Sequence, residues 1–181
     1  MKAFKLDKRI YREEHTILTA CEKIAKTGRN EMMQKVFYNA ETQEIVATNA
    51  FKLLIYNTPI IKDNLGDVGN GYVKLSGEYV IFDECGDEKF IGYGKLVDEF
   101  SADKTLSVDF NPSFMPPHSE AINNLALNGI PIAYKAVDTL DIIYPYVYNC
   151  RIQDSEKPIM FSGEEYGVTF MTMPCHMERW K

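Results

Sequence analysis

The residue types that most often carry out catalysis are scattered along this chain. Cys175 and His176 are neighbours, but adjacent residues of an extended strand point to opposite faces, so the pair does not predict a nucleophile with its base. His15 precedes a predicted helix and His118 lies in a proline-rich segment, and neither has the spacing of a metal ligand. We therefore expect no catalytic constellation, no metal site and no cofactor, and predict that the protein is not an enzyme.

Three further patterns have only weak links to ligand binding. The acidic turn at residues 83–88 lacks the spacing and central glycine of a calcium loop, which favours a solvated turn. The glycine pairs at 69–71 and 92–94 match half of a dinucleotide fingerprint, but no predicted helix follows them. Tyrosines alternate along residues 144–148, where a strand face would either stack nucleic-acid bases or pack against its neighbouring strands.

Composition and charge narrow the function classes. The chain has 181 residues, enough for one domain or for one and a half small repeated units. Its formal net charge of −6 excludes a protein that grips nucleic acid over its whole surface. A local, loose contact that neutralises few phosphates remains compatible with that charge.

The spacing of the cysteines and the distribution of apolar residues indicate the cellular compartment of the protein. The four cysteines form no C-x-x-C pair, so neither a zinc ribbon nor a thioredoxin-like motif is predicted. The first fifteen residues contain no apolar core of a signal peptide, and no stretch is long and apolar enough to span a membrane. We expect reduced thiols in a cytoplasmic protein without membrane contact.

Helical periodicity is clearest near the N-terminus. Residues 15–28 place Ile17, Leu18 and Cys21 on one face together with Ile24, and a glycine closes the segment. A second, shorter helix is predicted at residues 119–128, after a pair of prolines.

Elsewhere the period of two predicts strands. Residues 35–57 read as strand, turn, strand, sharp turn and strand, and residues 62–71 as a loop. Residues 72–84 are predicted to form a hairpin around Ser76-Gly77 or one bent strand. Further strand candidates are residues 89–97, 105–110, 131–149, 157–161 and 166–174.

This order predicts an α+β fold. We expect a single domain built from two strand–helix–strands halves, approximately residues 1–100 and 101–181. Neither half can bury the apolar face of its helix alone. The two helices should therefore pack on one face of antiparallel sheets.

Three segments carry a resemblance to a known family. Residues 45–53 (IVATNAFKL) resemble the segment Val-Ala-Thr-Asp-Gly-His-Arg-Leu of bacterial β-type DNA sliding clamps. Residues 157–161 and 166–174 look like the closing strands of that family, which end in Met-Pro-Met-Arg-Leu. Residues 108–114 (VDFNPSF) are similar to the strand and Asn-Pro turn that open the last helix of the family. The resemblance implies a DNA-clamp-like fold.

The sequence also departs from the family pattern. Asn49 and Ala50 replace the Asp and Gly of the first motif, and no basic residue lies between Asn111 and Gly129. Clamps of this family have three such domains in each of two chains. This chain has room for one domain, or for a first half like the middle domain of the family joined to a second half like the last.

The resemblance implies a processivity factor that surrounds duplex DNA as a head-to-tail homo-oligomer. Lys23, Lys26 and Arg29 are the matching candidates for phosphate contacts, and the alternative is that they form the solvated face of an amphipathic helix. The short length favours an origin in a phage or mobile element. A second hypothesis is a clamp-derived, non-catalytic interaction module that does not encircle DNA.

The resemblance further implies a hydrophobic pocket for peptide motifs of DNA polymerases and clamp loaders. Methionines suit such a pocket because thioether side chains repack easily. The alternative is that the strand members of this set are plain core residues. The matched positions are Thr48, Ala50, Phe51, Lys52, Leu53, Met171 and Met173, with Pro174 shaping the turn.

Overall fold

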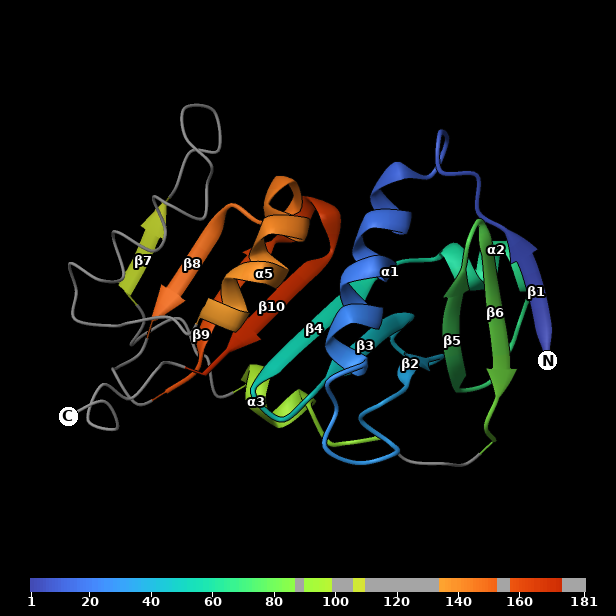
Figure 1. Cartoon of the computed structure of the whole chain (residues 1–181), viewed down its shortest axis with the longest axis horizontal. Coiled ribbons are helices and arrows are strands. Elements are labelled where there is room, and N and C mark those ends of the chain that lie inside the picture. The colour runs from blue at the N-terminus through green and yellow to red at the C-terminus, as the bar shows by residue number, and fades with distance from the viewer. Residues whose placement is uncertain (87–89, 99–105, 110–133, 153–156, 174–181) are drawn as a thin grey trace.

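The computed structural model describes residues 1–86, 90–98, 106–109, 134–152 and 157–173. Its strands form one antiparallel, ten-stranded sheet in the order β1-β6-β5-β2-β3-β4-β10-β9-β8-β7 (Figure 1). The strands are β1 (Lys2–Lys5), β2 (Val36–Asn39), β3 (Glu44–Thr48), β4 (Lys52–Asn57), β5 (Gly71–Ser76), β6 (Tyr79–Glu84), β7 (Leu106–Asp109), β8 (Asn149–Ile152), β9 (Ile159–Gly163) and β10 (Val168–Thr172).

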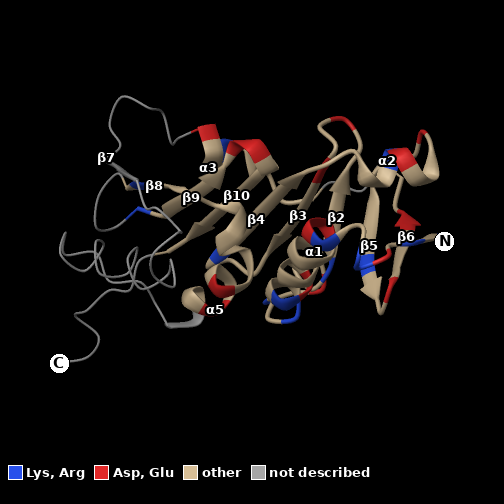
Figure 2. Ribbon diagram, turned by 90° about the horizontal axis from the view of Figure 1, so that it is seen from above, with Lys and Arg blue, Asp and Glu red and all other residues tan. Residues whose placement is uncertain are grey.

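Two of the helices in the described residues are longer than the others. Helices α1 (Arg12–Ala25) and α5 (Tyr134–Ile143) lie side by side on one face of the sheet. Figure 2 shows α2 (Ile60–Leu65) and α3 (Gly94–Asp98) on the other side of the molecule. The α+β class, with two helices on one face of an antiparallel sheet, is confirmed.

The sheet contains an internal repeat. The order β1-α1-β2-β3-β4 recurs as β7-α5-β8-β9-β10, and the final strands of the two units, β4 and β10, pair with each other. The β5–β6 hairpin is inserted between β1 and β2, so the first unit is wider than the second. The expected half boundary near residue 100 lies outside the described residues and stays a prediction.

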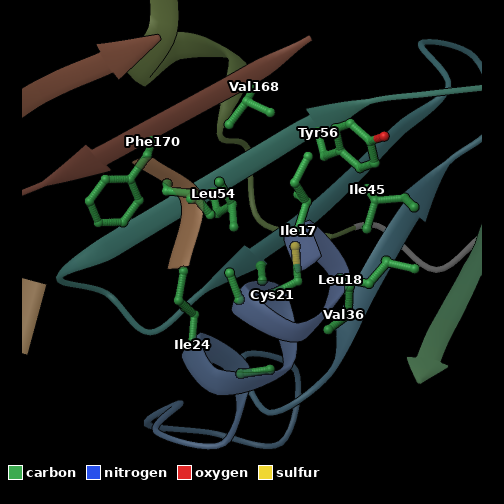
Figure 3. Packing of buried hydrophobic residues seen from close by; sticks show 14 of the residues in the cluster. Ile17, Leu18, Cys21, Ile24, Val36, Ile45, Leu54, Tyr56, Val168 and Phe170 are labelled. Atoms are coloured by element: carbon green, nitrogen blue, oxygen red, sulfur yellow. The ribbon is translucent and has the colours of Figure 1, made fainter. Parts of the chain in front are cut away.

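Helix α1 confirms the first predicted helix but begins and ends three residues earlier. Glu13 and Glu14 in its first turn favour helix formation, because carboxylates interact well with the positive end of the helix dipole. Ile17, Leu18 and Ile24 are buried against the sheet (Figure 3). Burying one such side chain contributes about 2 kcal/mol. This face therefore anchors α1 on the sheet.

Helix α5 corrects the prediction of a strand at residues 131–149. Ala136, Leu140 and Ile143 recur at helical spacing, and all three are buried. The β-branched residues between them made the segment resemble a strand. Tyr144 and Tyr146 lie in a 3-10 turn rather than on a strand face, which removes the basis for a stacking surface there.

Two other predictions were wrong and one lies outside the described residues. The loop expected at 62–71 begins with part of α2, because buried Ile60 and Ile61 anchor a helical turn. Within the strand expected at 89–97, the described residues 90–93 are irregular and lead into α3. The hairpin at 72–84 is confirmed as β5–β6. The helix expected at 119–128 lies outside the described residues.

Apolar side chains occupy both faces of the sheet. On β4, Leu54 and Tyr56 join the large core beneath α1, whereas Leu53 and Ile55 point to the opposite face. Figure 3 shows Leu54 and Tyr56 near Ile17 of α1. The outer face is therefore a second, smaller packing surface.

Candidate functional site: the helix face and the β4–β10 junction

The helix face carries the residues predicted to meet DNA. Lys23 on α1 reaches α5, where its Nζ donates to the Asp138 carbonyl oxygen at 3.3 Å and lies 3.9 Å from the Asp138 carboxylate. Arg29 lies beyond α1, with its guanidinium 4.4 Å from the centre of the Phe51 ring. Lys26 is exposed. Of the three, Lys23 and Arg29 thus have protein partners in the structure.

A shallow groove of about 590 Å³ runs along this face between α1 and the β5–β6 hairpin. It holds Lys23 and Lys26, but Glu22 and Glu78 also line it. The Glu22 carboxylate accepts a hydrogen bond from the Leu75 backbone N–H at 3.0 Å, which ties the helix to the hairpin. The groove therefore has mixed charge.

The two helices and residues 26–29, which follow α1, carry equal numbers of basic and acidic residues. A surface that attracts phosphates needs an excess of Lys and Arg. Figure 2 shows blue and red segments together on α1. The basic residues are Arg12, Lys23, Lys26, Arg29 and Lys135, and the acidic ones are Glu13, Glu14, Glu22, Asp138 and Asp141.

The loop between β3 and β4 is built by hydrogen bonds of its own side chains. The Thr48 hydroxyl donates to the Lys52 carbonyl oxygen at 2.8 Å. The side-chain oxygen of Asn49 accepts from the backbone N–H groups of Phe51 at 3.1 Å and Lys52 at 2.9 Å. Its amide nitrogen donates to the Thr27 hydroxyl at 2.7 Å, which joins the loop to the end of α1. Asn49 thus takes the turn-forming position of the motif.

The apex of this loop is conformationally demanding. Ala50 has a φ of 76°, in the left-handed region that glycine adopts most easily. It stands where the family motif has glycine. Phe51, the next residue, is 52% exposed and stacks under Arg29. The loop therefore holds Ala50 in a conformation that glycine adopts more easily.

The predicted pocket residues come together at the β4–β10 junction. Leu53 faces Met171 across the pair, and the Met173 backbone N–H donates to the Phe51 carbonyl oxygen at 2.9 Å. The resemblance predicted that these segments share a pocket, although more than a hundred residues separate them in the sequence. Pro174 lies outside the described residues.

The junction divides the predicted pocket between two faces. Lys52 points to the helix face, where its Nζ donates to the Thr139 hydroxyl of α5 at 3.0 Å. Leu53 and Met171 point to the outer face and are 5% and 3% exposed. The set is therefore not one open cavity, and its role in peptide binding stays a prediction.

The outer face carries an apolar patch that sequence analysis did not identify as a unit. This outer patch is covered by residues 90–98, which we call the covering segment. Phe90, Tyr93 and Val97 of that segment pack against it. The members of the outer patch are Val46, Leu53, Ile55, Met160 and Met171.

Polar and aromatic contacts hold the covering segment in place. The Phe90 ring stacks on Phe37 with ring centroids 4.7 Å apart. The Tyr93 hydroxyl donates to the Glu44 carboxylate at 2.7 Å and accepts from the Asn39 amide at 3.1 Å. Burial raises the pKa of Tyr93, and the neighbouring carboxylate raises it further. Tyr93 is therefore a neutral donor at physiological pH.

Two buried thiols have no sign of nucleophilic activation. Burial raises the pKa of Cys21 and raises that of Cys150 to about 12, so both are protonated at neutral pH. Within the described ranges, no three His, Cys, Asp or Glu side chains are arranged to hold a metal ion. None of the helices in the described part of the chain is long and apolar enough to cross a membrane.

A continuous antiparallel sheet, formed by two repeated units whose helices lie together on one face, defines a DNA-clamp type of fold. The sequence matches no protein-family model and no curated protein. Solved structures do match. The DNA polymerase sliding clamp of Caulobacter crescentus has a TM-score of 0.54 at 12% identity, over 97% of this chain and 65% of that one.

A second clamp gives the same result. The DNA polymerase sliding clamp of Bacillus subtilis has a TM-score of 0.52 at 9% identity, over 97% of this chain and 64% of that one. This chain therefore spans less than two thirds of the length of either clamp. The fold is that of the DNA polymerase III β sliding clamp, as the residue motifs predicted.

Proposed function

We propose that the protein is a clamp-type processivity factor that assembles around duplex DNA and docks replication proteins through short peptide motifs. The observation that carries this proposal is the pairing of β4 with β10, which joins the two repeated units into one sheet with α1 and α5 on one face. A protein with this function is non-catalytic and acts in the cytoplasm. The origin in a phage or mobile element stays a prediction.

The sheet supports head-to-tail assembly. Strands β1 and β7 stand at its opposite ends (Figure 1), and each has a described partner on one side. Free strand edges pair readily with another strand, so β1 of one copy is suited to β7 of the next. Such pairing would extend the sheet and close a ring, because a heterologous contact with the correct rotation is cyclic.

Topology gives the decisive test. We would measure the mass of the full chain by light scattering and its retention on nicked circular and linearised DNA. A ring slides off free ends, so it is retained on circles and lost from linear DNA. A strict monomer at high concentration, or equal retention on the two forms, contradicts encirclement.

Charge reversal tests the helix face. Lys23→Glu with Lys26→Glu is expected to lower retention and polymerase stimulation at low salt, because two candidate phosphate contacts become repulsive. The matched control is Lys62→Glu with Lys95→Glu, which makes the same charge change on α2 and α3, on the other side of the molecule. Equal effects of the two pairs would show that net charge alone matters.

The balance of charges on the helices favours a second candidate function. A clamp-derived module that docks peptides without encircling DNA needs no basic inner face. The Lys23–Asp138 contact supports this candidate because it neutralises a residue that a clamp would present to phosphate. The same retention assay separates the candidates: the module binds partner peptides but is not retained on circular DNA.

A further inference from the structure

The covering segment is attached mainly through side chains. Among the described residues, the backbone hydrogen bonds of residues 90–98 close within the segment. The Tyr93 N–H donates to the Ile91 carbonyl oxygen at 2.8 Å, and the N–H groups of Leu96 and Val97 donate to the Tyr93 carbonyl oxygen at 3.0 and 3.4 Å. It is therefore not a strand of the sheet in the described residues. Segments held by few side-chain contacts open at lower free energy than a paired strand does.

An open pocket lies at the covering segment. Its volume is about 860 Å³, and it is lined by Phe90, Tyr93 and Val97 of the segment and by Phe37, Glu44 and Ile55 of the sheet. Polar side chains such as Asn39 and Thr42 also line it, and Ile55 is the member of the outer patch that reaches it. A pocket of this size is in the range that small ligands occupy.

The outer patch itself has the chemistry of a docking surface. It is entirely apolar, and Met160 and Met171 lie next to each other on paired strands β9 and β10. Methionine side chains adapt to differing partners. The patch is buried while residues 90–98 cover it, and apolar surface of this kind marks an interaction site once it is uncovered. Leu53 and Met171 belong both to this patch and to the predicted peptide pocket.

We infer that residues 90–98 are a displaceable internal ligand of the outer patch, and that a partner peptide with similar apolar residues takes their place. The contacts of the segment define the partner: an aromatic ring on Phe37, a hydrogen-bond donor to Glu44 and an aliphatic side chain against the outer patch. In the segment these groups come from Phe90, Tyr93 and Val97. The identity of the partner rests on the proposed function, but the occupancy of the patch does not.

The first test uses a labelled synthetic peptide of residues 90–98 and the full-length chain. In the variant Phe90→Ser with Tyr93→Ser the internal ligand is weakened, and fluorescence anisotropy should show binding about tenfold tighter than to the wild type. The reason is that apparent affinity falls with the fraction of open protein. The matched control is Lys95→Ser with Leu96→Ser, whose side chains are exposed on the same segment, and it should bind like the wild type.

The second test needs no peptide. Hydrogen peroxide oxidises exposed methionines faster, and peptide mapping by mass spectrometry reports each position. Met160 and Met171 are 6% and 3% exposed, whereas Met32 is 39% exposed and serves as the internal standard. In the variant Phe90→Ser with Tyr93→Ser, which we call the released variant, oxidation of the two covered methionines should accelerate several-fold relative to Met32. Cooperative unfolding of the same variant shows that it is still folded.

A milder variant guards against loss of folding. Tyr93→Phe keeps the ring and removes only the hydrogen bond to Glu44, so it should shift both readouts in the same direction by a smaller factor. Unchanged methionine protection in a folded released variant overturns the inference, and so does accelerated oxidation without peptide binding. If both readouts change but DNA retention and polymerase stimulation are absent, the inference stands and the proposed function fails.

Discussion

Replacing Ala50 by glycine is expected to stabilise the protein, although alanine-to-glycine changes usually destabilise. Ala50 has a φ of 76° at the apex of the β3–β4 loop, and its methyl group is exposed. The left-handed conformation costs an L-residue about 1–2 kcal/mol, because Cβ approaches the following carbonyl oxygen. Glycine does not have this cost. The hydrogen bonds of the loop involve backbone groups and neighbouring side chains, so the substitution leaves them in place.

The stabilisation gained by relieving the strain at residue 50 is partly offset by the greater backbone entropy of glycine in the unfolded state. Glycine loses more backbone freedom on folding than alanine, which costs about 0.5–1 kcal/mol. The difference is a net stabilisation of about 0.5–1 kcal/mol for Ala50→Gly. Little apolar burial is lost because the methyl group is exposed.

Urea unfolding at constant m-value measures this difference as a rise in the midpoint. The matched control is Ala3→Gly, at an exposed alanine of β1 that is not among the residues with positive φ. There only the entropic cost remains, so the control should lose about 0.5–1 kcal/mol. If Ala50→Gly loses as much as Ala3→Gly, the backbone of Ala50 is not strained and the reasoning is refuted.

Three further predictions concern packing, protonation and the link between β4 and α5. Gly163→Ala should lower the free energy of unfolding by about 2 kcal/mol or more, because its Cβ would overlap the Tyr146 carbonyl oxygen; an unchanged urea midpoint contradicts this. Burial raises the folded pKa of Cys150 from 9.0 to about 12, so the stability gained by keeping the thiol protonated is complete below pH 9 and is lost as the pH rises toward 12. Between these pH values the wild type should lose up to about 1.4 kcal/mol of unfolding free energy per pH unit relative to Cys150→Ala. Parallel stability curves for the two proteins would contradict this prediction. Lys52→Met should cost about 1 kcal/mol in thermal unfolding, because it removes the donor to buried Thr139, whereas a neutral result would show that this bond gives no net stability.

Sequence reasoning predicted the elements whose periodicity is unambiguous. Helix α1 has a full apolar stripe, and the β5–β6 hairpin has a turn glycine, Gly77, with a φ of 63°. Helix α5 was missed because Val137, Ile142 and Ile143 are β-branched residues common in strands. The segment is nevertheless helical, because packing of its apolar face on the sheet overrides a weak local preference for the strand conformation.

The candidate site was predicted in its composition but not in its geometry. The motif at residues 45–53 identified the β3–β4 loop, and the resemblance linked it to the closing strand. Successive side chains of a strand point to opposite faces of the sheet. Once β4 is known to lie between the helices and the covering segment, Lys52 must therefore point to the helices and Leu53 to the outer patch. The sequence did not reveal the covering segment, because residues 89–97 were predicted to form a strand. The spacing of Phe90, Tyr93 and Val97 was therefore not interpreted as one packing face.

The clamp fold and the clamp function rest on different residues in this chain. The fold depends on apolar contacts such as Ile17 and Phe170 in the large core, and these do not change when surface charges do. Electrostatic attraction to DNA depends on an excess of positive charge. Helices α1 and α5 lack such an excess, because their acidic residues outnumber their basic ones. Because each copy has a net charge of −6, further copies add no excess of positive charge. Under the proposed function, retention on DNA therefore depends on topological closure, and closure requires an oligomer.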